Sequence, residues 1–294
     1  MFETKIGSVV LKNPVLTASG TFGMGEPFED FYDYGILGGV VLKTLTPKPR
    51  KGNPPPRLYE TPSGLLNSIG LENEGFDAFA ERIKKNNPFV SWKTRVVISL
   101  AGDEEGDFAQ LAAKASQIPG IDLIELNLSC PNVHAGGATF DAESEAVYRI
   151  VSLACEKSSL PCIVKLSPQH DIVANAYQAE KAGASAVTIS NTFLGMAIDI
   201  HQKRFVFARK FAGLSGPAIK PLALANVYRV AQKVTISIIA SGGIASGEDA
   251  VEFLLAGARL IEIGTMAFVK PRLAVEVVDT LERYFGNEQP RRLD

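Results

Sequence analysis

The sequence predicts a (β/α)8 barrel formed by a single domain of residues 1–294. Short apolar runs alternate eight times with stretches of helical periodicity. The length suits one barrel, which commonly uses about 250 residues. Predicted helices tend to end at glycine, as in Lys181-Ala182-Gly183 and Leu255-Ala256-Gly257, which fits a left-handed C-cap. A doubly wound open sheet is the alternative, and we favour the barrel because glycines suited to phosphate follow the last two strands.

The repeat unit is a strand followed by a helix, and each predicted element has its own apolar run or helical face. The strands are expected at residues 15–18, 39–43, 95–100, 123–127, 162–166, 186–190, 237–240 and 260–263. The helices are expected at residues 27–34, 74–86, 104–117, 141–157, 171–181, 220–233, 247–255 and 271–284.

Three segments lie outside this repeat. Residues 4–15 read as a β-hairpin turning at Gly7-Ser8, placed to cap the bottom of the barrel. Residues 46–72 are rich in proline and glycine, and residues 191–221 form a second long insertion after strand six. Loops of this length in a compact domain are usually functional or disordered. We expect both insertions on the face where the strands end, which is the catalytic face of such barrels.

Composition excludes several classes of function. Hydrophobic residues make up 46% and charged residues 21%, with a net charge of -2 and a pI of about 6.0, so no basic surface for nucleic acid is indicated. No apolar run approaches the roughly 18 residues of a membrane span, and the N-terminus does not resemble a signal peptide. Three cysteines without CxxC spacing favour neither disulfides nor a metal site. These features suggest a cytoplasmic protein.

Cys130 is the most informative residue. It lies in Glu125-Leu126-Asn127-Leu128-Ser129-Cys130-Pro131-Asn132, where an apolar strand runs into a polar, turn-forming loop. At the C-terminal end of a barrel strand a thiol can serve as a base or nucleophile. Cys155 and Cys162 are expected to be core thiols, and His170 and His201 are interpreted as surface or loop residues.

Glycines after the last two strands indicate a phosphate site. Gly242 and Gly243 follow strand seven, and Gly264-Thr265 follows strand eight. Backbone N–H groups can converge on an anion there, since glycine lets the chain approach closely. The alternative is that these glycines only form tight turns.

Lysines and asparagines complete the candidate site. Lys43 and Lys165 lie at or in apolar strands, where a lysine is costly unless an anion or a cofactor pairs with it; a buried salt bridge is the alternative. Asparagines predicted on the catalytic face suit a planar ligand with alternating C=O and N–H groups, although they could simply cap turns. They are Asn67, Asn127, Asn132 and Asn191.

Several segments, in order along nearly the whole chain, resemble the dihydroorotate dehydrogenase family. They are Ala18-Ser19-Gly20, Lys43-Thr44, Asn67-Ser68-Ile69-Gly70-Leu71, Asn127-Leu128-Ser129-Cys130-Pro131-Asn132, Ser190-Asn191-Thr192, Gly213-Leu214-Ser215-Gly216-Pro217, Ser241-Gly242-Gly243-Ile244 and Gly264-Thr265. The cysteine resembles the class 1 enzymes, whereas the membrane-bound class is expected to use serine there and to carry an N-terminal extension. Residues 213–221 look most like the NAD-linked subclass, class 1B.

The resemblance implies oxidation of dihydroorotate to orotate with FMN, in pyrimidine synthesis. Cys130 would remove the C5 proton while a hydride passes from C6 to N5 of FMN. The substrate would contact Lys43, Asn67, Ser68, Ile69, Gly70, Leu71, Asn127, Asn191 and Thr192. FMN would contact Ala18, Ser19, Gly20, Lys43, Thr44, Ser99, Asn127, Lys165, Ser190, Gly216, Gly242, Gly243, Gly264 and Thr265. Ser99 departs from the asparagine that the family often has there, and a hydroxyl offers fewer hydrogen bonds.

The resemblance to the NAD-linked subclass also implies a partner. A second subunit would carry FAD and a [2Fe–2S] cluster, because this chain has neither a Gly-x-Gly-x-x-Gly fingerprint nor a cysteine cluster. A homodimeric core with two partner chains, a heterotetramer, is then expected. A stand-alone homodimer that uses fumarate is the close alternative. A non-redox phosphate-binding lyase or isomerase is a remote alternative, which would not need Cys130 or the asparagines, and a non-catalytic binding barrel is a third.

Overall fold

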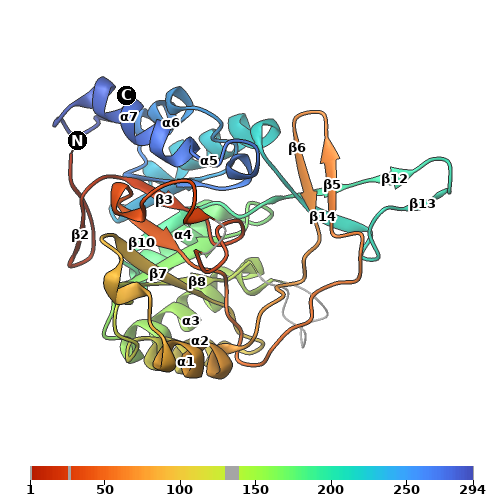
Figure 1. Cartoon of the computed structure of the whole chain (residues 1–294), viewed down its shortest axis with the longest axis horizontal. Helices are drawn as coiled ribbons and strands as arrows, with labels where there is room; N and C mark the ends of the chain where they lie inside the picture. Colours follow the sequence, from red (N-terminus) through yellow and green to blue (C-terminus); the bar gives the residue numbers. More distant parts are fainter. Residues whose placement is uncertain (1, 26–27, 130–138, 294) are drawn as a thin grey trace.

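A closed barrel of eight parallel strands forms the body of the protein (Figure 1). The computed structural model describes residues 2–25, 28–129 and 139–293. The barrel strands are β3 (Val15–Thr17), β4 (Gly39–Val41), β7 (Arg95–Leu100), β8 (Leu123–Asn127), β9 (Cys162–Leu166), β10 (Ala186–Ile189), β15 (Ser237–Ser241) and β16 (Leu260–Ile263). They pair in chain order, and β16 closes the ring onto β3. The predicted barrel and its eight strands are confirmed, and the open sheet is excluded.

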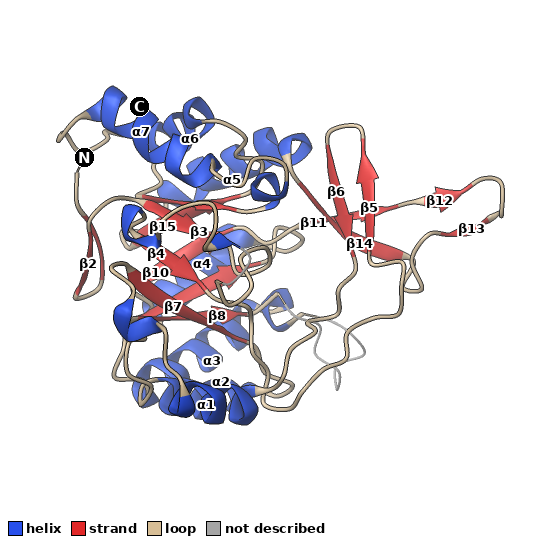
Figure 2. Cartoon of the chain, viewed as in Figure 1, coloured by secondary structure: helices blue, strands red, loops and turns tan. Residues whose placement is uncertain are grey.

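Helices follow the strands and surround the barrel (Figure 2). They are α1 (Phe76–Lys85), α2 (Glu105–Ala115), α3 (Ser144–Lys157), α4 (Ile172–Lys181), α5 (Lys220–Ala231), α6 (Gly247–Leu255) and α7 (Leu273–Phe285). Short 3-10 helices are η2 (Tyr34–Ile36), η3 (Phe89–Ser91), η4 (Phe140–Ala142), η5 (Pro217–Ile219) and η6 (Thr265–Phe268). Local capping explains some of the starts: the Ser246 hydroxyl accepts from the N–H of Asp249 and begins α6.

One predicted helix, at residues 27–34, is wrong. The described part of this segment forms turns and then η2. Phe28, Tyr32 and Tyr34 are all buried. Tyr32 and Tyr34 are two residues apart and cannot lie on the same face of a helix, so burying both rings favours an irregular path. The rings of Phe22 and Phe28 stack with their centroids 5.3 Å apart.

The floor of the barrel is apolar. The predicted hairpin is present as β1 (Thr4–Ile6) and β2 (Val9–Leu11), paired antiparallel. Its buried Ile6 and Leu11 pack against the inward side chains of the strand starts. Those side chains are Leu16, Val41, Val97, Leu123, Ile163, Ala186, Ile239 and Leu260. The hairpin therefore closes the bottom, as the sequence predicted.

The two insertions fold together into a sheet rather than remaining loops. β5 (Leu58–Thr61) and β6 (Gly64–Asn67) come from the first, and β11 (Phe193–Met196) and β14 (Phe211–Ser215) from the second. They pair in the order β11-β14-β6-β5, and the chain between β11 and β14 extends into the ribbon β12 (Ile198–Asp199) and β13 (Arg204–Phe205). We call this four-stranded unit the projecting sheet, because it extends away from the barrel in Figure 1.

Within the described residues, no helix is long and apolar enough to cross a membrane.

Candidate active site

A cavity of about 1000 Å³ lies where the barrel strands end and the projecting sheet begins. Its wall contains every residue predicted above for substrate or cofactor except Ser99. Ser99 is fully buried and does not line the cavity. Cys130, Pro131 and Asn132 lie outside the described residues. Segments that are far apart in the sequence thus meet at one hollow, at the barrel end where active sites of this fold lie.

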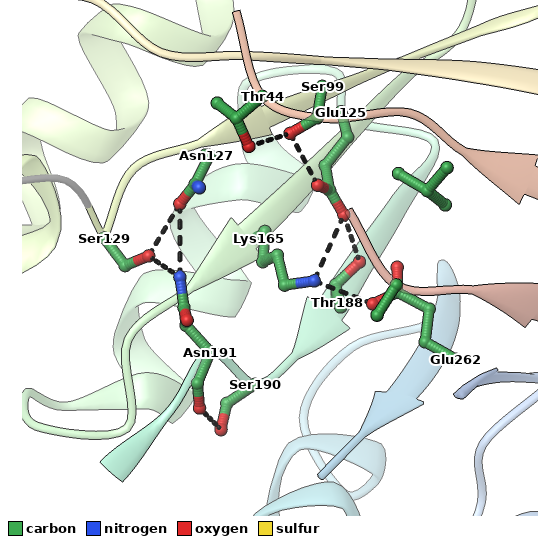
Figure 3. Close-up of polar contacts among 12 residues, drawn as sticks. Thr44, Ser99, Glu125, Asn127, Ser129, Lys165, Thr188, Ser190, Asn191 and Glu262 are labelled. Atoms are coloured by element: carbon green, nitrogen blue, oxygen red, sulfur yellow. Dashed lines mark hydrogen bonds and ion pairs between the residues drawn. The ribbon is translucent and has the colours of Figure 1, made fainter. Parts of the chain in front are cut away.

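A buried polar cluster crosses the barrel interior beneath this cavity (Figure 3). Its members are Ser99, Glu125, Lys165, Thr188 and Glu262, which come from β7, β8, β9, β10 and β16. Lys165 Nζ lies 2.7 Å from Glu262 Oε2 and 3.7 Å from Glu125 Oε2. Lys165 and Glu262 also line the cavity. The alternative interpretation of Lys165 as a member of a buried salt bridge is therefore correct, and the same residue also reaches the cavity.

Hydroxyl groups complete the partners of Glu125. Ser99 Oγ donates to Glu125 Oε1 over 2.8 Å and lies 2.9 Å from Thr44 Oγ1. Thr188 Oγ1 lies 3.5 Å from Glu125 Oε2. Both oxygens of Glu125 are therefore occupied. Ser99 connects the cavity residue Thr44 to the cluster, and any effect of Ser99 on a ligand would pass through Thr44 or Glu125.

The cluster shifts the pKa of two of its members. Burial raises the pKa of Glu262 to about 7; Lys165 opposes this shift, and the like charge of Glu125 adds to it. Burial alone would lower the pKa of Lys165, but the two carboxylates outweigh burial and raise it. Lys165 is therefore a permanent cation at neutral pH. Among the described residues, Glu262 Oε1 is the buried side-chain polar atom left without a hydrogen-bond partner.

Three polar side chains gather at the adjoining strand ends. Ser129 Oγ donates to Asn127 Oδ1 over 2.6 Å. Asn191 Nδ2 donates to Ser129 Oγ and lies 3.4 Å from Asn127 Oδ1. Asn67 approaches from the projecting sheet, where its Nδ2 donates to Gly213 O over 3.1 Å. The amides of Asn67, Asn127 and Asn191 all line the cavity, as the sequence predicted.

The predicted phosphate glycines form a narrow cradle. Gly242 and Gly243 have positive φ values of 126° and 81°. A Cβ on Gly243 would lie 2.5 Å from Lys220 Cα, so only glycine fits. Lys220 itself points to Asp249 and Glu252 in ion pairs. Backbone N–H groups are thus the donors that this cradle offers to an anion.

Two cavity residues were not anticipated from the sequence in this role. Glu262 was treated only as part of an apolar strand, although an acidic residue inside Leu260–Ile263 was the visible signal. His170 was interpreted as a surface or loop residue; it does lie in a loop, but it lines the cavity, with Nε2 2.8 Å from Thr139 Oγ1. No sequence pattern marked that contact.

The predictions for Cys155 and Cys162 agree with the structure. Cys155 packs against the core from α3, and Cys162 is buried at the start of β9. Across the part of the chain that is described, no group of His, Cys, Asp and Glu side chains could hold a metal ion. Lys43 lines the cavity half-buried, and burial lowers its pKa against the opposing charge of Glu72.

Comparison with known proteins identifies the family. Residues 1–285 match the family model for dihydroorotate dehydrogenase. Three relatives carry the name dihydroorotate dehydrogenase B (NAD(+)), catalytic subunit. The protein from Thermoanaerobacter sp. (strain X514) is 46% identical over 96% of this chain and 93% of its own length. Those from Alkaliphilus metalliredigens and Trichlorobacter lovleyi are 44% and 45% identical over 96% and 97% of this chain, and over 93% of their own lengths. The chain belongs to the dihydroorotate dehydrogenase family.

Proposed function

We propose that this protein oxidises dihydroorotate to orotate in pyrimidine biosynthesis, with FMN as its cofactor and NAD as the final electron acceptor. The observation that carries the proposal is the single cavity where the asparagine amides, two lysines and the glycine cradle meet. A planar, hydrogen-bonding substrate and a phosphate-bearing cofactor need these groups together. The names of the relatives support the substrate and the NAD-linked type.

The residues present fit FMN. Gly242 and Gly243 line the cavity, and their backbone N–H groups are the donors that would hold the phosphate. Lys165 places a buried positive charge in the cavity wall, suited to an electron-rich ring. Ala18, Ser19, Gly20, Thr44, Ser190, Gly216, Gly264 and Thr265 complete the proposed cofactor contacts. FMN, when bound, accepts the hydride that leaves C6 of the substrate.

The chain itself supplies orientation and a base. Asn67, Asn127 and Asn191, with Lys43 and Thr192, hold the ring and the carboxylate of dihydroorotate. Cys130, which follows the Asn127–Ser129 pair in the sequence, removes the C5 proton as thiolate. Loss of that proton and of the C6 hydride creates the C5–C6 double bond of orotate.

The base assignment has a pH signature. A cysteine thiol with an ordinary pKa of about 8.5 is mostly protonated at neutral pH, so turnover should rise with pH toward a limb that belongs to Cys130. The measurement is kcat/KM for dihydroorotate from pH 6 to 9. Flat activity over this range would count against Cys130 as the base.

We assign the second half of the reaction to a partner. Two copies of this chain pair with two subunits that carry FAD and a [2Fe–2S] cluster, which pass electrons from FMN to NAD in the cytoplasm. The relatives are named as catalytic subunits, which supports a separate partner. Assaying the purified chain alone with NAD and with fumarate separates this arrangement from a stand-alone fumarate-using homodimer. NAD reduction that requires the second subunit supports the proposal, and fumarate reduction by the chain alone contradicts it.

The first test of the proposal is an absorbance spectrum of the purified chain. Bands near about 370 and 450 nm indicate bound flavin, and their bleaching when dihydroorotate is added without oxygen indicates the substrate. A yellow protein that does not bleach would keep the cofactor and reject the substrate. A colourless protein that stays colourless when FMN is supplied would favour a non-redox barrel.

A further inference from the structure

Glu262 has no role in the reaction proposed above, yet it lies in the cavity wall. Glu262 is only 1% exposed, and its Oε2 lies 2.7 Å from Lys165 Nζ. Oε1 is buried and has no hydrogen-bond partner among the described residues. A buried acceptor without a partner is costly, and Glu262 lines the cavity, so its unpaired oxygen indicates a contact with a ligand.

The charges of the cluster show what kind of contact this is. Two carboxylates, Glu125 and Glu262, share one ammonium, that of Lys165. If both carboxylates were ionised, the buried cluster would carry a net negative charge, which is costly in the barrel interior. One proton removes that charge. Glu125 has partners on both oxygens, whereas Glu262 has a free oxygen where a proton can reside.

No other titratable group adds a charge to this cluster of two carboxylates and one ammonium. The neighbours of Glu262 on the adjoining strands are Leu16 of β3 and Ser241 of β15, which do not titrate near neutral pH. From across the barrel, the groups that affect its pKa are Lys165 and Glu125. Burial and Glu125 together keep the acid form accessible near neutral pH despite the nearby Lys165.

We propose that Glu262 is a cofactor-binding residue that carries the proton of the cluster on Oε1 and donates it in a hydrogen bond to an acceptor atom of the FMN ring. This inference rests on the proposed function. The flavin ring presents carbonyl oxygens and ring nitrogens as acceptors, which a neutral carboxylic acid satisfies. An ionised Glu262 could only accept, and it would repel a ring that gains electrons. Glu125 takes no part in the contact, because it does not line the cavity.

The experiment measures FMN binding against pH. The chain is stripped of cofactor, and the FMN dissociation constant is measured by fluorescence quenching from pH 6.0 to 8.5. Glu262→Gln keeps the shape and provides a permanent N–H donor. Glu105→Gln, at an exposed glutamate paired with Arg149, removes one charge far from the cluster and serves as the matched control. The FMN phosphate has a pKa near about 6 and titrates equally in all three proteins.

In the wild type the dissociation constant should rise by about tenfold or more between pH 6.0 and 8.5, because binding then requires uptake of one proton. Glu105→Gln should follow the wild type. Glu262→Gln should bind at the low-pH affinity of the wild type throughout, with only the change due to phosphate. The same pH dependence in Glu262→Gln, or affinity that rises with pH in the wild type, overturns the inference but keeps FMN binding. No FMN binding by the wild type at any pH overturns the proposed function as well.

A second measurement uses the unmodified chain alone and so does not depend on how Glu262→Gln folds. Titration calorimetry at pH 8.0 in buffers of different ionisation enthalpy counts the protons taken up when FMN binds. Uptake of about one proton per FMN is expected. Uptake near zero contradicts a protonated Glu262 in the complex.

Discussion

The two ends of the barrel interior differ in polarity: one end is lined by aliphatic side chains and the other by polar and charged ones. At the floor, ten buried aliphatic side chains from the hairpin and the strand starts pack together, with no charge among them. One layer higher, the same strands place Ser99, Glu125, Lys165, Thr188 and Glu262 in the interior. The floor stabilises the fold by removing apolar surface from water. The polar cluster contributes less to stability and gives the cavity a charge, a proton and hydrogen-bond donors. The difference indicates that function is confined to one end of the barrel.

The largest expected effect is on turnover and leaves stability unchanged. Cys130→Ala should lower kcat for dihydroorotate oxidation by about 10²–10⁴-fold, since the base is lost. Bound FMN, measured by its absorbance, should remain. An unfolding midpoint equal to that of the wild type would show that the loss is chemical. Turnover within a few-fold of the wild type would exclude Cys130 as the base.

Removal of the Lys165 cation should lower stability in a pH-dependent way. Lys165→Met leaves Glu125 and Glu262 without their ammonium partner, so the free energy of unfolding should fall by about 3–5 kcal/mol at pH 8. At pH 5 the loss should be smaller, because the carboxyl groups can take up protons. Urea denaturation at both pH values measures this difference. An equal loss at the two values would mean that packing, rather than charge, decides the effect.

The floor should respond in stability alone. Leu123→Ala creates a cavity beneath the hairpin and should lower the free energy of unfolding by about 2–5 kcal/mol. The FMN dissociation constant of the folded fraction should match that of the wild type, because the floor does not contact the cavity. Denaturation followed by FMN titration tests both parts. A large change in FMN affinity would show that the two ends are coupled.

The polar cluster, unlike the apolar floor, should make the free energy of unfolding depend on pH. The folded pKa of Glu262 is raised to about 7 from an ordinary value of 4.5. Between these values the folded protein holds a proton that the unfolded chain has released. The free energy of unfolding of the cofactor-free protein, relative to Glu262→Gln, should therefore fall as pH rises from about 4.5 to 7, and then level off. A difference between the two proteins that stays constant over this range contradicts the raised pKa.

The smallest effect is expected at the link between cavity and cluster. Ser99→Ala removes the hydroxyl between Thr44 and Glu125, and it should cost about 1 kcal/mol of stability and change FMN affinity only modestly. The test is the unfolding midpoint together with the FMN dissociation constant. A large loss of FMN binding would show that Ser99 does more than connect Thr44 to Glu125.

The fold was predictable where the pattern was local. Short, continuous apolar runs between helical stretches predicted all eight barrel strands, because parallel strands buried on both faces are hydrophobic along their whole length. Residues 27–34 failed because their aromatic rings are buried by contacts with distant residues, such as Tyr34 with Trp92. The projecting sheet was missed because β6 pairs with β14, a strand from another insertion, and short exposed strands carry little periodicity.

The site was predictable where chemistry limits the choice of residue. The left-handed φ of Gly243 and the amides of Asn127 and Asn191 are visible as residue types at strand ends. The polar cluster was predicted only in part. The sequence indicated Lys165 as an unusual buried cation, but not its pairing with Glu262, which is 97 residues away. Pairing across a closed barrel depends on strand order and register, which one sequence does not specify.

The projecting sheet also bears on how the protein folds. The hydroxyl of Ser215 bonds the backbone of Leu65 across a separation of 150 residues. Closing so long a loop costs conformational entropy, which is offset only after most of the intervening barrel has assembled. Contacts of this range therefore form slowly. We expect the wall of the cavity to be among the last parts of the chain to become ordered. A newly made chain would then become able to take up its cofactor only at the end of folding.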